Sequence, residues 1–197
     1  MTNPKPITSA LLLLDADVLH PIRICDFILT AAALKLIARP VVSAMILEEA
    51  ERNVRADRPD AGSAARINRR FDAVRSVVDG FDQPIPKRYV DAAMVNPKDQ
   101  HVLAAALHHG AEFVVTNDTR LRREITAWIA EHGKRRKLVA AISADELATR
   151  LLAESRSGVE SVIREMASRF RNPPRSYTEV VDGLAKSMPS LALLADR

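Results

Sequence analysis

Acidic side chains recur at four places where a strand is expected to end or a helix to begin. In the stretch LLLLDADVL, residues 11–19, four leucines lead directly into two aspartates, although desolvating a carboxylate is costly without a compensating partner. A metal ion, phosphate chemistry or a helix cap would each explain such a pattern. The residues in question, in chain order, are Asp15 with Asp17, Glu48 with Glu49, Asp99, and Asn117 with Asp118.

Each of these acids, taken singly, has a structural explanation. Asp15 could form a local turn and Glu49 could lie on a solvated helix face, whereas Asp99 and Asp118 could favour the N-termini of helices. Together, however, carboxylates around one pocket repel one another and raise the pKa of at least one, so the arrangement is stable chiefly when a cation neutralises it. Because the sequence offers no Cys or His cluster, the hard ions Mg2+ and Mn2+ are favoured, and phosphodiester hydrolysis is the chemistry they would serve.

Short apolar segments alternate with helical patterns and would position these acids. Strands are predicted at residues 11–14, 113–116 and 138–142, with a short extended segment at 40–43. Helices are predicted at residues 26–37, 43–54 with Ser43 as cap, 64–78, 96–110, from 119 onward and from 143 onward. Continuous apolar strands between helices indicate an α/β fold with three layers, α/β/α, around a central parallel sheet. Asp15 and Asp118 both follow strands, at the edge where ligands bind in such folds.

The C-terminal part has a different pattern. A helical apolar stripe between Val159 and Phe170 is followed by a second stripe between Tyr177 and Met188. Such stripes belong to a core more often than to a partner surface. The chain is therefore divided into a domain at residues 8–150 and a helical extension at residues 155–197.

Length and composition fit a globular protein with a sizeable core. The chain has 197 residues, of which 47% are hydrophobic. Its single cysteine, Cys25, excludes an internal disulfide framework and a Cys-rich zinc module, and is expected in the core. No segment approaches the roughly 18 uninterrupted apolar residues of a membrane span and no signal peptide is recognisable, so a soluble, cytoplasmic protein is expected.

Basic residues account for a net charge of +4 and gather in clusters that could neutralise nucleic-acid phosphates or form a solvated face. The clusters are Arg120, Arg122 and Arg123; residues 134–137; and Arg169, Arg171 and Arg175.

The histidines of one predicted helix and the single tryptophan are interpreted as structural residues rather than as ligands or base-stacking groups. His101, His108 and His109 share one predicted helix without a defined set of zinc ligands, and they are expected at the surface or its boundary. Trp128 lies among isoleucines and is expected to pack in the core rather than to stack on bases.

Four segments, in their order and spacing, resemble the PIN-domain family, and the longer chain is similar to the VapC-type toxins of bacterial toxin–antitoxin pairs. The segments are LLLLDADVL, VSAMILEEAERNV, NPKDQHVLAAALHHGAEFVVTND and the TRL that follows. The third is the most specific, and the resemblance covers about residues 8–145. It implies a PIN-like fold and a metal-dependent ribonuclease.

The resemblance also assigns roles to the acids. It implies that Asp15, Asp99 and Asp118 hold Mg2+ or Mn2+. Glu49 would bind the ion directly or through water, and its neighbour Glu48 is the alternative for that position.

Further residues beside the acids would support the site. Asp17 stands where many relatives have Asn or Ser, so it would either strengthen metal binding or face solvent. Thr116 and Asn117 lie where a polar group often supports the metal ligands, and Asn117 replaces a common Gly, which leaves the turn geometry open.

Partners follow from the same resemblance. RNA would be the substrate, a small antitoxin protein would occlude the site, and dimerisation into a homodimer is common in the family. The residues expected to steer the RNA backbone are Arg120, Arg122, Arg123, Lys87 and Arg88.

Two other functions are compatible with part of the pattern. A haloacid-dehalogenase-like phosphatase would use Asp15 and Asp17 as nucleophile and acid, but Lys137 is a poor substitute for its later lysine, and two of the acids would have no role. A non-catalytic PIN-like module would bind nucleic acid or protein without cleavage, although the presence of every matched acid argues against a degenerate site.

Overall fold

A parallel sheet of three short strands forms the centre of the computed structural model, which describes residues 6–57, 61–93, 95–133 and 137–195. The strands are β1 (Leu12–Leu14), β2 (Phe113–Val115) and β3 (Ala140–Ile142), and β2 lies in the middle. Leu14 is paired with Val115, so the residues that follow β1 and β2 leave the sheet at the same edge. Isolated parallel bridges from Leu13 to Val41 and from Val41 to Asp79 extend the sheet beyond β1.

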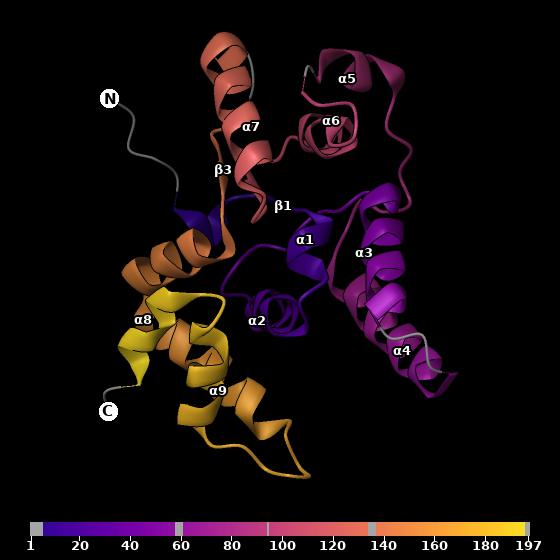
Figure 1. Ribbon diagram of the computed structural model, residues 1–197. Helices are drawn as coiled ribbons and strands as arrows, with labels where there is room; N and C mark the ends of the chain where they lie inside the picture. Colours follow the sequence, from indigo (N-terminus) through magenta and orange to yellow (C-terminus); the bar gives the residue numbers. More distant parts are fainter. Residues whose placement is uncertain (1–5, 58–60, 94, 134–136, 196–197) are drawn as a thin grey trace.

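Helices cover both faces of the sheet, which confirms the predicted three-layer α/β/α fold. Figure 1 shows α6 (Gln100–His109) and α7 (Thr119–His132) on one side of the strands, and α2 (Ile22–Ala33) and α8 (Ala144–Ser168) on the other. All residues of β1 and β2 are buried, as expected for apolar strands enclosed on both faces.

Four further helices lie in the chain between β1 and β2, together with α2 and α6. They are α1 (Ala16–Leu19), α3 (Ala44–Asp57), α4 (Ala61–Val77) and α5 (Lys87–Ala92). The Ser43 cap is confirmed, because its hydroxyl accepts a hydrogen bond from the Ile46 N–H at 3.3 Å. The helices α1 and α5 were not predicted, since four to six residues are too few for a readable periodicity.

One helix boundary near the site differs from the prediction. The helix expected from Asn96 begins at Gln100, with Asp99 as its N-terminal flanking residue. The Asn96 side chain instead accepts a hydrogen bond from the Lys98 N–H at 3.0 Å, which closes a turn before the helix. At the other end Gly110 has a φ of +68° and terminates the helix as predicted.

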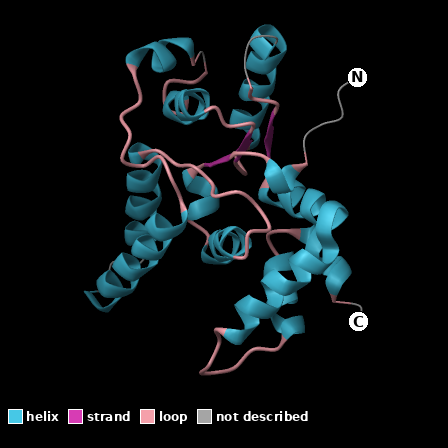
Figure 2. Ribbon diagram, turned by 180° about the vertical axis from the view of Figure 1, so that it is seen from behind, coloured by secondary structure: helices cyan, strands magenta, loops and turns pink. Residues whose placement is uncertain are grey.

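The C-terminal region is helical, and its buried residues belong to the same hydrophobic core cluster as those of the sheet and α2. Helix α8 contains one non-helical residue, Ser155, and is followed by α9 (Tyr177–Ala185) and the 3-10 helix η3 (Pro189–Leu194). These elements lie together in Figure 2. The predicted core assignment of both stripes is confirmed by the buried residues Val159, Val162, Ile163, Met166, Val180, Val181, Leu184 and Met188. Within the described residues, no helix combines the length and the apolar character that crossing a membrane requires.

Candidate metal centre

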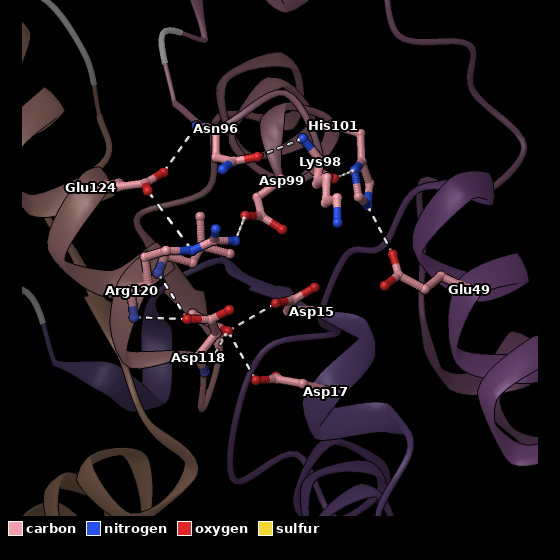
Figure 3. Close-up of polar contacts among 12 residues, drawn as sticks. Asp15, Asp17, Glu49, Asn96, Lys98, Asp99, His101, Asp118, Arg120 and Glu124 are labelled. Carbon is pink, nitrogen blue, oxygen red and sulfur yellow. Dashed lines mark hydrogen bonds and ion pairs between the residues drawn. The ribbon is translucent and has the colours of Figure 1, made fainter. Parts of the chain in front are cut away.

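Five acids from four segments of the chain line one cavity of about 210 Å³ at the carboxyl edge of the sheet. They are Asp15, Asp17, Glu49, Asp99 and Asp118, and Figure 3 shows their carboxylates turned toward a common space. The structure thus brings together every acid that sequence analysis singled out except Glu48, which is exposed on α3 outside the cavity lining.

Asp15 is the most buried of these acids, with 7% of its surface exposed. Its Oδ1 accepts a hydrogen bond from the Ala16 N–H at 2.7 Å, so the residue also caps α1. Its Oδ2 accepts from the hydroxyl of Thr116 at 2.8 Å. Burial raises the pKa of Asp15 above its ordinary value, and the nearby charge of Glu49 adds to this effect, whereas both hydrogen bonds oppose it.

Asp17 faces the cavity rather than solvent. Its Oδ2 accepts from the Asn117 backbone N–H at 2.7 Å and contacts the Thr116 hydroxyl at 3.1 Å, while its Oδ1 is buried without a hydrogen-bond partner. Burial and then the charge of Asp15 raise the pKa of Asp17 to about 7. One hydroxyl hydrogen cannot serve both aspartates fully, so this pair has a deficit of positive charge that a cation or a proton would fill.

Asp118 caps a helix and also lines the cavity, although sequence analysis treated a capping role and a place in the site as alternatives. Its Oδ1 accepts hydrogen bonds from the N–H groups of Arg120 and Leu121, at 2.7 Å and 3.0 Å, and so caps α7. Because both bonds go to Oδ1, the second carboxylate oxygen is available to the cavity.

Asp99 precedes α6 but makes no side-chain capping bond. Its Oδ2 accepts instead from Nη2 of Arg120 at 2.6 Å. Glu124, one turn further along α7, accepts from the Asn96 N–H at 2.9 Å and fixes the loop that carries Asp99. The position of this acid is therefore set by contacts with α7.

Glu49 reaches the cavity from α3 and faces a histidine that sequence analysis did not assign to the site. Nε2 of His101 lies 3.3 Å from Oε2 of Glu49, and His20 and Asn53 also line the cavity. His101 is partly buried at the surface boundary, as predicted. Its side chain faces the acidic cavity and forms part of the cavity wall. One feature of the sequence could have indicated this placement: His101 follows Asp99 by two residues and lies in the first turn of α6.

The supporting polar positions also lie at the site. Thr116 is fully buried and its hydroxyl accepts from the Asp118 N–H at 3.2 Å, so one side chain connects three of the aspartates. Oδ1 of Asn117 accepts from the Ala144 N–H at 3.1 Å and so binds the start of α8. Asn117 does not have a positive φ, so the loop needs no glycine there.

Of the basic residues expected to contact RNA, only Arg120 touches one of the five acids. Arg122 is ion-paired with Glu146 of α8 at 3.3 Å. Arg123, Lys87 and Arg88 are exposed. Of the cluster at 134–137, residues 134–136 lie outside the described part of the chain.

The remaining candidates pack elsewhere, as predicted. Burial raises the pKa of the Cys25 thiol, which does not favour a reactive thiolate. Trp128 is buried and its indole N–H donates to the Ala92 carbonyl at 3.0 Å. His108 and His109 line a separate cavity with Lys137.

The donors at this site suit a hard divalent ion, although the side chains do not form a ready coordination sphere. The unpartnered Oδ1 of Asp17 and the raised pKa values of two aspartates indicate a need for positive charge, and carboxylate oxygens are what Mg2+ and Mn2+ prefer. Among the described residues, no group of three or more His, Cys, Asp or Glu side chains stands close enough to hold one ion. Arg120 and His101 contact two of the acids instead.

Two family models match the chain. A model described as PIN domain matches residues 12–120, more than half of the chain, and this span contains all five acids. A model described as VapC50 C-terminal domain matches residues 144–195, from the first residue of α8 to the end of the described chain. No curated protein and no solved structure gives a significant match.

Proposed function

Because the chain belongs to the PIN-domain family, we propose that it is a metal-dependent endoribonuclease, a hydrolase that cleaves RNA phosphodiester bonds, and that it acts as the toxin of a toxin–antitoxin pair. PIN domains and VapC proteins are typically nucleases. The observation that carries the proposal is the convergence of five carboxylates, distant in the sequence, on one cavity.

In this proposal Asp15, Asp99 and Asp118, with Glu49, hold Mg2+ or Mn2+. The ion would polarise the phosphoryl group and provide a water of lowered pKa as nucleophile. The chain itself contributes orientation. The Thr116 hydroxyl fixes the carboxylate of Asp15, and the first turn of α7 fixes that of Asp118, so both acids are held before any ligand arrives.

RNA would approach along exposed basic side chains. Arg120 lies at the cavity and 46% of its side chain is exposed, so a phosphate could reach its guanidinium. Arg123, Lys87 and Arg88 would add salt-dependent attraction without sequence preference. In this proposal the protein acts in the cytoplasm, with a small antitoxin protein as its partner and a homodimer as its assembly.

A second candidate function is a PIN-like module that binds nucleic acid or protein without cleaving it. The ion pair of Asp99 with Arg120 favours it, because it neutralises one of the acids within the chain. The phosphatase alternative has less support. The lysine that it would need, Lys137, lines the separate cavity of His108 and His109.

Cleavage of defined RNAs by the purified chain tests the proposal. Cleavage should require Mn2+ or Mg2+, should stop in EDTA, and should be lost in Asp99→Asn with an unchanged circular dichroism spectrum. Glu48→Gln is the matched control, because this acid neighbours Glu49 but lies outside the cavity, and it should keep full activity. Full activity of Asp99→Asn would refute the nuclease. RNA binding without metal-dependent cleavage would support the non-catalytic module.

A further inference from the structure

His101 has a side chain oriented at both ends of its ring. Only 14% of the side chain is exposed, and it lines the same cavity as the five acids. Nδ1 lies 3.0 Å from the Lys98 carbonyl oxygen, within the loop that leads into α6. Nε2 points to Glu49 of α3, with 3.3 Å between Nε2 and Oε2, as Figure 3 shows.

The first of these contacts fixes the tautomer. A carbonyl oxygen can only accept, so Nδ1 must carry the hydrogen, and in the neutral ring Nε2 is then an acceptor with a free lone pair. That atom is buried and forms no hydrogen bond. A lone pair and a carboxylate oxygen at this separation repel each other unless a proton on Nε2 or a metal ion lies between them.

We propose that Nε2 of His101 is a metal ligand, bound together with Glu49, so that the centre includes one nitrogen donor among its carboxylates. This inference rests on the proposed function, because it requires a divalent ion in the cavity. Two neighbouring ligands at right angles on an ion, with bonds of roughly 2.1 Å, are separated by roughly 3 Å, close to the observed spacing of the two atoms. The hydrogen bond from Nδ1 to a backbone carbonyl is the usual support of a metal-binding histidine.

The other histidine in the cavity wall does not qualify. Nε2 of His20 is 2.8 Å from Oδ2 of Asp57 and is therefore already hydrogen-bonded away from the acids. A nitrogen donor at the centre would thus come from His101. It would favour transition-metal ions over Mg2+, which prefers oxygen ligands throughout.

Mn2+ is a suitable probe because its electron spin reports on bound nitrogen. The full-length protein would be titrated with Mn2+, and the bound ion examined by electron spin echo envelope modulation. We expect nitrogen coupling in the natural protein and its loss in His101→Gln, together with a roughly tenfold or greater loss of Mn2+ affinity. His108→Gln is the matched control on the same helix, outside this cavity, and should keep both the coupling and the affinity.

The possible results separate this inference from the proposed function. Bound Mn2+ without nitrogen coupling in the natural protein would overturn the ligand role of His101 and leave the nuclease proposal intact. Coupling that persists in His101→Gln would also overturn it, since another nitrogen would be the ligand. Failure of the natural protein to bind Mn2+ at all would overturn both. If His101→Gln does not fold, His20→Gln gives the second test, because coupling that persists without the other cavity histidine supports His101, and coupling lost with it would overturn the ligand role.

Discussion

Nη2 of Arg120 donates a hydrogen bond to Oδ2 of Asp99 over 2.6 Å, so a guanidinium from α7 neutralises the acid that precedes α6. The same arginine lies 3.9 Å from Glu124 of its own helix, to which it could turn. Arg120 would therefore compete with a metal ion for Asp99, and among the basic residues expected to contact RNA it is the one that touches an acid of the cavity.

Removal of this internal cation should strengthen metal binding. In Arg120→Gln we expect Mn2+ affinity to rise about two- to fivefold, because the ion pair is partly exposed and worth no more than about 1 kcal/mol. RNA affinity should fall in the same variant. Isothermal titration calorimetry at constant ionic strength measures the first effect and filter binding the second. Arg123→Gln, an exposed change on the same helix, is the control for the Mn2+ measurement only and should leave Mn2+ affinity unchanged. A lower Mn2+ affinity in Arg120→Gln would contradict the competition.

Asp17 should make the protein less stable as the pH rises. The folded state holds a proton on Asp17 up to about pH 7, whereas the unfolded chain loses it near pH 3.8. The free energy of unfolding should therefore fall between about pH 4 and pH 7 and stay low above that range. Asp17→Asn removes this loss and should gain about 1 kcal/mol at pH 8 in EDTA, or about 2–4 °C in Tm, with no comparable gain at pH 4.

Thermal melts across this pH range measure that difference. Asp72→Asn, a change at an aspartate with 73% of its side chain exposed, should not alter the pH dependence. An equal gain at both pH values in Asp17→Asn would mean that the stabilisation has another source.

The Thr116 hydroxyl should be required for both stability and metal binding. Thr116→Val removes the group that donates to Asp15, contacts Asp17 and accepts from the Asp118 N–H, which should cost about 1–3 kcal/mol. Its loss should also raise the pKa of both aspartates further, so Mn2+ affinity near neutral pH should drop. Denaturant unfolding and Mn2+ titration measure the two effects. Thr116→Ser keeps the hydroxyl and should retain most of the stability and most of the Mn2+ affinity. If Thr116→Val matched Thr116→Ser in both quantities, the role of the hydroxyl would be refuted.

Local sequence signals were sufficient for much of the fold. The leucines before Asp15 and the FVV before Thr116 predicted two strands of a parallel sheet, and this alone places the residues after them at one edge. Ser43 and Gly110 marked helix ends because capping depends on neighbouring backbone groups. Prediction was weaker at Asn96, because its side chain closes a turn with the Lys98 N–H and the residue that flanks the helix start is Asp99, three positions later than predicted.

Relationships between distant segments could not be read from the sequence. The contact of Arg120 with Asp99 spans two helices, and neither residue has a local pattern that distinguishes an ion pair from a free site residue. His101 was assigned to the boundary correctly, but which cavity its ring faces depends on how α6 packs against α3. Such facts belong to tertiary packing, which periodicity does not encode.

The pairing of β1 with β2 has a consequence for the time at which the protein becomes active. Asp15 and Thr116, which share a hydrogen bond, are 101 positions apart in the chain. During synthesis, Asp15 and Asp17 leave the ribosome long before β2, the strand that pairs with β1, has been made. The acids therefore remain separated throughout most of synthesis, and the proposed centre first assembles when residue 118 has emerged, so a chain truncated before that point would be harmless to RNA.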